Sequence, residues 1–151
     1  MDQAADSLAI ARRLKEECPR IGSVYESSMQ DFDGHKEYNC IVLRYVSGYL
    51  DDKELERFLS RLGNMLARKS KSLKGPDQQE SYIIVQEQVL PEGESHPGEF
   101  GQRVRTERSL EAIFYRTNLD VAKTQGPESL IAKYHDVKMW ALALSDIGFE
   151  Y

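Results

Sequence analysis

The stretch YNCIVLRYVSGYLDDKELERFLSRLGNML, residues 38–66, decides the fold of this chain. Its first part, residues 38–46, is rich in β-branched and aromatic side chains, which favour an extended strand. Gly48 ends that pattern, and Asp51 with its neighbour Asp52 then offers an acidic N-cap for a helix. The stretch therefore predicts a strand followed directly by a helix.

The helix that starts after Asp51 has two different faces. Apolar residues recur at helical spacing from Leu55 to Leu73, so we expect the helix to end just before Gly75-Pro76. Basic residues fall nearly opposite them, within an arc of about 80°. This predicted anion-binding face consists of Arg57, Arg61, Arg68 and Lys71.

Two more elements precede this stretch. Residues 2–17 repeat apolar side chains at helical spacing until Pro19, which predicts a first helix. The pair Asp33-Gly34 lies between residues 21–30 and the strand at 38–46, and such a pair favours a type I′ turn. We therefore expect a β-hairpin that closes near Asp33-Gly34.

Residues 81–117 predict two strands separated by a loop. SYIIVQEQVL, residues 81–90, has strand composition and is followed by Pro91. Residues 91–101 hold three glycines, two prolines and no basic group, which predicts a mobile acidic loop. Residues 104–117 fit a helix or a strand, and the run Ile113-Phe114-Tyr115 favours a strand.

A last helix is expected over residues 126–148, because Gly126-Pro127 suits its start and Gly148 its end. The predicted order is α-β-β-α-β-β-α. This order indicates an α+β protein with an antiparallel sheet of about four to five strands and helices packed mainly on one face. A length of 151 residues suits a single globular domain over residues 1–151.

The charges are segregated along the chain, although the net charge is only −5. Residues 57–76 carry six basic and no acidic side chains, whereas residues 77–101 carry six acidic and no basic ones. A protein that binds polyanions with its whole surface is therefore disfavoured. Neither an export signal nor an apolar run of membrane-spanning length is visible, so we expect a cytoplasmic protein. Cys18 and Cys40 lack the spacing of a metal site and are expected to be reduced.

Motifs that carry catalysis or bind a metal are missing from the sequence. No GxSxG, HExxH, P-loop or dinucleotide-binding glycine fingerprint is present. Asp31, Asp33, His35 and Glu37 suggest a cation-binding loop, but Val42 stands where an EF-hand needs its last acidic ligand. A polar turn explains the same residues. We therefore expect no catalytic residue, no metal and no cofactor.

A magnesium-dependent nuclease is the enzyme alternative. Pro76-Asp77 precedes the strand that carries Glu87, and two such acids hold Mg²⁺ for phosphodiester hydrolysis in some nucleases. Val89 occupies the position where a lysine is expected, which disfavours this alternative.

The second face of the predicted sheet is the main candidate site. We expect Ile41, Leu43 and Tyr45 to pack against the helices, so the alternate residues leave a mixed aromatic, aliphatic and arginine surface. Such a surface is typical of an interaction site. The predicted partner-binding residues are Tyr38, Val42, Arg44, Tyr82, Ile84, Gln86, Phe114 and Arg116.

By elimination, the sequence predicts a protein-binding module without catalytic activity: a chaperone, an adaptor or an inhibitor of another protein. Its element order and acidity resemble those of small dimeric secretion chaperones, and a homodimer would bury the apolar sheet face. The alternative from a different class is a nucleic-acid-binding protein that uses the basic helix face of residues 57–74. No membrane partner is expected.

Overall fold

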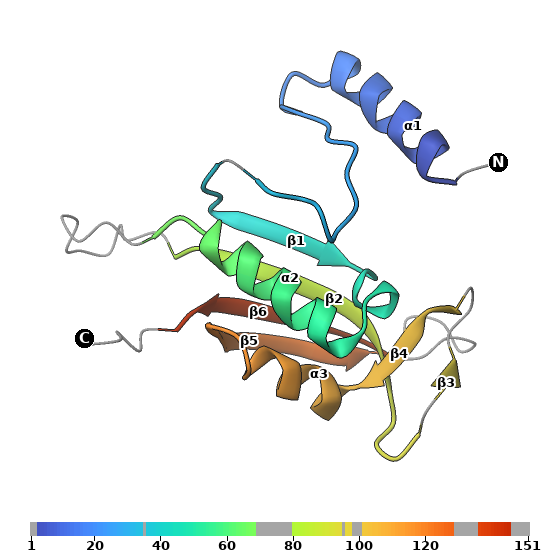
Figure 1. The fold of residues 1–151 in the computed structure, drawn as a ribbon, viewed down its shortest axis with the longest axis vertical. Coiled ribbons are helices and arrows are strands. Elements are labelled where there is room, and N and C mark those ends of the chain that lie inside the picture. Colours follow the sequence, from blue (N-terminus) through green and yellow to red (C-terminus); the bar gives the residue numbers. More distant parts are fainter. Residues whose placement is uncertain are drawn as a thin grey trace. The chain divides into compact units, whose positions relative to one another are not determined.

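The computed structural model describes residues 3–34, 36–68, 80–94, 96–97, 101–128 and 136–145. The chain divides into two compact units, Met1–Phe32 and Asp33–Tyr151. Each unit has its own helices or sheet, as Figure 1 shows.

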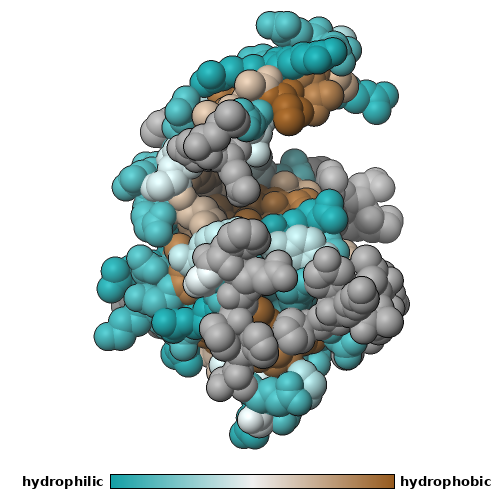
Figure 2. All heavy atoms as spheres, turned by 90° about the vertical axis from the view of Figure 1, so that its right-hand side faces the viewer, coloured by the Kyte–Doolittle hydropathy of each residue, from teal (hydrophilic) through white to brown (hydrophobic). Residues whose placement is uncertain are grey.

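The first unit contains helix α1, Gln3–Glu17, followed by a segment without regular structure. The helix predicted over residues 2–17 is thus confirmed. Arg12 donates a hydrogen bond to Glu26 at 3.0 Å, which ties α1 to the segment that follows it. Two apolar side chains of α1, Ile10 and Leu14, are exposed. Figure 2 shows hydrophobic surface, in brown, on this first unit.

The second unit is built on a mixed sheet whose central strand is β2, Tyr82–Leu90. One edge of β2 pairs antiparallel with β6, Asp136–Leu144, and β6 pairs with β5, Leu119–Glu128. The other edge of β2 pairs in parallel with β1, Cys40–Arg44, and further along with β4, Arg103–Thr106. Two strands therefore share one edge of β2 in succession.

A short strand, β3, His96–Pro97, pairs with β4 and completes the sheet of the described residues. Residues 91–94 lead into β3, so part of the predicted acidic loop contains a strand. The remaining residues of that loop, 95 and 98–100, lie outside the described residues.

Three helical segments accompany the sheet in the described part of the second unit. They are η1, Ser47–Tyr49, α2, Asp52–Asn64, and α3, Glu107–Phe114. Figure 1 shows α2 and α3 on the same face of the sheet. The core between them and the sheet is made of Leu55, Phe58, Leu59, Leu62, Leu110, Ile113, Phe114, Ile83, Val85, Trp140 and Leu142, which are all buried.

The start of α2 is fixed by a reciprocal cap. The Asp51 carboxylate accepts the N–H of Glu54 at 2.8 Å, and the Glu54 carboxylate accepts the N–H of Asp51 at 2.9 Å. These bonds satisfy backbone donors that have no partner inside the helix. The N-cap predicted at Asp51 is confirmed.

The predicted fold class, α+β with helices mainly on one face, is confirmed. The sheet, however, is mixed and not antiparallel, because β1 pairs in parallel with β2 through the crossover helix α2. The hairpin predicted at Asp33-Gly34 is wrong. Residues 21–34 are described and contain no strand, and β1 takes its partner from the apolar run of β2 instead.

Two elements have the opposite type to the one predicted. Residues 104–117 contain α3, because Thr106 caps the N–H of Ser109 and the buried Leu110, Ile113 and Phe114 follow helical spacing. Within the predicted last helix, β5 extends to Glu128 and Asp136–Leu144 forms β6. Lys138, Trp140 and Leu142 are buried in alternation, which is the period of a strand.

The long basic helix is shorter than predicted within the described residues. Helix α2 ends at Asn64, where Met65 forms its C-cap. Residues 69–79, which include Lys71, lie outside the described part of the chain. None of the described helices combines the length and apolar character needed to cross a membrane.

Candidate functional site

A pocket lies on the edge of β2 between the end of β1 and the start of β4. The pairing of β1 ends at Arg44 opposite Gln86, and the pairing of β4 starts at Arg105 opposite Val89. The pocket is open on one side, has a volume of about 120 Å³ and is lined by Tyr45, Gly48, Glu87, Gln88, Gln102, Arg103 and Val104. It thus sits beyond the carboxyl end of β1, which is where open α/β sheets bind their ligands.

Tyr45 forms one wall of the pocket in an unusual backbone conformation. Its φ angle is 55°, in the left-handed region that side-chain-bearing residues seldom adopt. This conformation turns Tyr45 away from the strand pattern, and 37% of the residue is exposed. The prediction that Tyr45 packs against the helices is therefore wrong. Backbone strain of this kind clusters at functional sites.

Gln86 holds Tyr45 from the neighbouring strand. The main-chain N–H of Tyr45 donates to the Gln86 carbonyl at 2.9 Å, and the Gln86 side-chain amide donates to the Tyr45 hydroxyl at 3.0 Å. Arg44 completes the set, because its Nε donates to Gln86 Oε1 at 3.0 Å and its guanidinium lies 5.9 Å from the Tyr45 ring centroid. The position of the phenol is therefore fixed by both strands.

Glu87 forms the buried side of the pocket. Its Oε1 accepts two backbone N–H groups, from Val46 at 2.9 Å and from Ser47 at 2.8 Å. Burial raises the pKa of Glu87, and the hydrogen bonds from Ser47 and Val46 and the charge of Arg105 oppose that rise. The carboxylate is thus occupied in holding the start of η1.

Arg105 holds η1 from the other side. Its guanidinium donates to the carbonyl groups of Ser47 at 2.8 Å and Leu50 at 2.7 Å, and also to the Asp52 carboxylate at 2.9 Å. The side chain is only 4% exposed. A buried guanidinium with three acceptors in this geometry leaves little freedom to the turn it binds.

Gly48 allows η1 to approach β4 closely. A Cβ at this position would lie 3.1 Å from the carbonyl oxygen of Arg103 and 3.3 Å from Cβ of Gln102. Across the same contact, the Gln102 side-chain amide donates to the hydroxyl of Tyr49. The pocket is therefore closed on this side by direct contact between η1 and β4.

The side chains that line the pocket include an aromatic ring, two carboxamides, the carboxyl group of Glu87 and the guanidinium of Arg103. Tyr45 presents an aromatic ring, whose face attracts cations, and Gln88 and Gln102 present carboxamides, which accept or donate hydrogen bonds. Such a set can hold an amine nitrogen and stabilise positive charge that develops on it.

A family model described as AdoMet-dependent proline di-methyltransferase matches residues 2–143. The chain belongs to this family. Search of the curated proteins found no significant match.

Solved methyltransferases share the fold of this family member. A SAM-dependent methyltransferase from Leishmania major has a TM-score of 0.70 and 20% identity, over 89% of this chain and 51% of that one. A SAM-dependent methyltransferase from Clostridium acetobutylicum has a TM-score of 0.67 and 11% identity, over 95% and 72% of the two chains. Magnesium protoporphyrin IX methyltransferase from Synechocystis has a TM-score of 0.59 and 11% identity, over 91% and 54%. The chain thus spans about half the length of the Leishmania protein.

Membership in the methyltransferase family corrects the predicted function. The chain was expected to be a protein-binding module without catalytic activity, such as a chaperone or adaptor, and that expectation is wrong because the family consists of enzymes by its description. The nucleic-acid-binding and nuclease alternatives fall with it. Glu87, the acid of the nuclease alternative, accepts backbone N–H groups, and Asp77 lies outside the described residues.

The pocket fits one part of AdoMet. The reactive end of AdoMet is a sulfonium cation, and an aromatic ring such as that of Tyr45, which lines the pocket, attracts cations. The pocket volume of about 120 Å³ is below the roughly 300–1,000 Å³ of a usual small-molecule site. The part of the pocket that the described residues form is therefore too small to hold the whole of AdoMet.

Five of the predicted partner-binding residues share one face of the sheet. The register places Val42 beside Ile84 and Arg44 beside Gln86, and Tyr82 lies on the same face. Val42 is 58% exposed. Arg44 and Gln86 also belong to the network that holds Tyr45, so this face adjoins the pocket.

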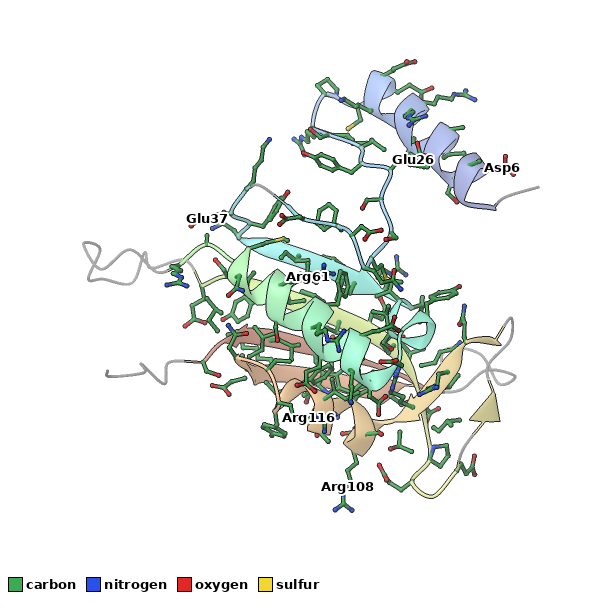
Figure 3. All side chains as sticks on the ribbon, viewed as in Figure 1. Asp6, Glu26, Glu37, Arg61, Arg108 and Arg116 are labelled. Carbon is green, nitrogen blue, oxygen red and sulfur yellow. The ribbon has the colours of Figure 1, made fainter. Side chains whose placement is uncertain are left out.

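The other three residues predicted for that face lie elsewhere. Phe114 is buried on α3, because the segment that carries it is a helix and packs on the opposite side of the sheet. Arg116 follows α3 and donates to Glu56 of α2 at 3.0 Å (Figure 3). Tyr38 forms an isolated bridge with Leu66.

The predicted anion-binding face is only partly described. Arg57 is exposed on α2, and Arg61, labelled in Figure 3, is partly buried with its guanidinium 5.8 Å from the Phe58 ring centroid. Arg68 lies beyond the end of α2, and Lys71 is outside the described residues. The described arginines therefore do not form one helical row.

Sequence reasoning missed Tyr45, Gln88 and Gln102 as site residues. The available signal was the order strand, glycine-containing turn, helix and strand over residues 38–90, which is typical of a parallel β-α-β unit. That order would have placed the ends of both strands at one edge of the sheet.

Proposed function

We propose that this chain forms the acceptor side of an AdoMet-dependent methyltransferase that methylates the nitrogen of a proline residue. The observation that carries the proposal is the pocket beyond the carboxyl end of β1, walled by Tyr45 in a left-handed backbone conformation, in a chain that the family model matches over residues 2–143. The acceptor and the donor both come from the family description, and the pocket supports a small nitrogen-containing group.

The reaction sets clear demands on this pocket. AdoMet, when bound, supplies an electrophilic methyl group on a sulfonium leaving group. The proline nitrogen must present a free lone pair, because a protonated amine cannot attack. With AdoMet bound, the nitrogen would take the methyl group and the sulfonium sulfur would leave with the electron pair of its carbon–sulfur bond. The nitrogen becomes positively charged at the same time, and it must lose its remaining proton before it can take a second methyl group.

The residues of this chain can meet these demands from the acceptor side. We assign to the Tyr45 ring the stabilisation of the positive charge that develops on nitrogen. We assign to the Gln88 and Gln102 carboxamides the hydrogen bonds that orient the acceptor, since both line the pocket. The small volume would favour a compact ring over a long side chain.

The experiment uses the purified natural protein with AdoMet and two peptides that differ only in their first residue, proline or alanine. The expected result is the addition of one and then two methyl groups to the proline peptide, detected by mass spectrometry. Tyr45→Ala should reduce kcat/KM by about tenfold or more, because it removes the cation-stabilising ring. The matched control is Tyr115→Ala, since Tyr115 is 70% exposed and lies outside the pocket.

Absence of any methylation of either peptide would contradict the proposed acceptor, and equal loss in both tyrosine variants would contradict the role of Tyr45. The expected cytoplasmic location and homodimer stay predictions, as does a protein partner, which in this proposal supplies the proline acceptor.

A further inference from the structure

Two buried charged side chains hydrogen-bond the turn that carries Ser47, one from each side. Glu87 accepts the N–H of Ser47, and Arg105 donates to the carbonyl oxygen of the same residue, both at 2.8 Å. Glu87 is 5% exposed and Arg105 6%. One residue of the turn is therefore fixed at its donor and at its acceptor by charges of opposite sign.

The two gripping residues belong to rigid, paired strands. Glu87 lies on β2 and Arg105 on β4, and β4 pairs with β2 at Val89. Each residue also makes a second contact with the turn: Glu87 with the N–H of Val46, and Arg105 with the carbonyl oxygen of Leu50. The segment from residue 46 to residue 50 is thus held by these two side chains at Val46, Ser47 and Leu50.

This segment directly follows Tyr45 and contains Gly48, which both line the pocket. Tyr45 has a strained backbone, and a strained residue persists only where its surroundings over-determine it. We propose that Glu87 and Arg105 are positioning residues: their joint grip on Ser47 holds the Tyr45 wall in the shape that binds the methyl acceptor. The inference rests on the proposed function for the identity of that acceptor.

Neither residue is assigned contact with the reacting atoms. Both backbone N–H groups converge on one oxygen of Glu87, so a glutamine amide oxygen can take its place. A lysine cannot replace Arg105 in the same way, because the guanidinium donates to three separate acceptors with three different nitrogens. The geometry therefore predicts that Glu87→Gln preserves the hydrogen bonds to the turn and that Arg105→Lys loses them.

The test compares the wild type with Glu87→Gln, Glu87→Ala and Arg105→Lys, and with the double variant that combines Glu87→Ala and Arg105→Lys. The Arg116–Glu56 ion pair, at 3.0 Å and more exposed, gives the matched control Arg116→Lys. NMR measures amide exchange at Val46 and Ser47 and the N–H to Hα coupling of Tyr45. Enzyme kinetics measure KM and kcat for the proline peptide.

Glu87→Ala and Arg105→Lys should each speed exchange at Val46 and Ser47 by about tenfold or more, change the Tyr45 coupling, and raise KM by about tenfold, with a smaller change in kcat. The double variant should be little worse than either single one, because both act through Ser47. Glu87→Gln and Arg116→Lys should stay within about threefold of the wild type on every measure.

Faster exchange of all amides together, with KM unchanged, would overturn the inference, because the two residues would then serve only stability. Unchanged exchange at Val46 and Ser47 would overturn it as well. If the wild type does not act on the proline peptide, the proposed function fails, and the exchange and coupling measurements still decide whether the grip shapes the Tyr45 wall.

Discussion

Trp140 on β6 donates its indole N–H to the carboxylate of Glu111 on α3 at 2.8 Å, which joins the sheet to one of its covering helices. The indole ring also meets Phe114 edge-on, with ring centroids 5.6 Å apart. Lys138, two residues earlier on the same strand, pairs with Glu107 and, at 3.5 Å, with Glu111. This junction combines aromatic packing with charged hydrogen bonds.

Replacement of Trp140 should therefore be costly. Trp140→Ala is expected to lower the free energy of unfolding by about 3–5 kcal/mol, because the residue is 1% exposed and leaves a large cavity. Trp140→Phe keeps much of the ring and loses the indole bond, so it should cost less, about 1–3 kcal/mol. Urea unfolding followed by circular dichroism measures both, with Tyr115→Ala as an exposed control. Equal losses in the two Trp140 variants would count against the role of packing.

Gly48→Ala should disturb the pocket and stability together. The added methyl group would meet the main-chain carbonyl of Arg103, which cannot move aside as a flexible side chain does. A loss of about 1–3 kcal/mol is expected, together with weaker binding of the proline peptide. Gly22→Ala is the control, since a Cβ there meets nothing within 4 Å. Similar behaviour of the two variants in unfolding and binding experiments would refute the close contact.

The cap at Asp51 should make the stability of α2 depend on acid. The hydrogen bond from the Glu54 N–H lowers the pKa of Asp51 below its ordinary value of 3.8. A lowered pKa stabilises the fold above the unfolded-state value, and that contribution is lost as the pH falls through the folded-state value. Asp51→Ala should therefore lower the melting temperature at neutral pH, and the difference from wild type should shrink in strong acid. A constant difference from neutral pH into strong acid would contradict this.

The contribution of Glu87 to stability should depend on pH in the opposite direction. Burial raises its pKa above the ordinary value of 4.5, so its contribution to stability is full below that value and falls as the pH rises through the folded-state pKa. Wild type should thus lose stability relative to Glu87→Gln as the pH increases from about 4.5 towards neutrality. Urea unfolding of both proteins over this range gives the difference directly. A difference that grows in favour of wild type would show that the hydrogen bonds from Val46 and Ser47 outweigh burial.

Local sequence signals were sufficient to predict the helices and strands whose ends are marked by capping or breaking residues. The first helix and the start of α2 at Asp51 were predicted from apolar spacing and capping, and both depend on residues close in sequence. The strand β2 was predicted from a short apolar run between breakers. These interactions are complete within a few residues, so tertiary contacts did not overrule them.

Elements whose type depends on distant partners were not predictable in the same way. The run Ile113-Phe114 suits a strand by composition, yet it packs as a helix under the cap of Thr106. Trp140 and its neighbours suit a helix by spacing, yet they pair with β2, which lies about fifty residues earlier. The pocket was missed for the same reason, since the parallel pairing of β1 with β2 brings Tyr45 to Gln86 and Glu87.

The hydrogen bonds from Glu87 and Arg105 to η1 also affect how readily proteases cut the chain. The segment from Val46 to Leu50 is held mainly by the side chains of Glu87 and Arg105, and not by a strand ladder. It can therefore open in a local unfolding event that leaves the sheet intact. Limited proteolysis should therefore cut this turn earlier in Glu87→Ala or Arg105→Lys than in the wild type, and an acceptor bound against Tyr45 should protect it, because binding to the closed form raises the free energy of opening.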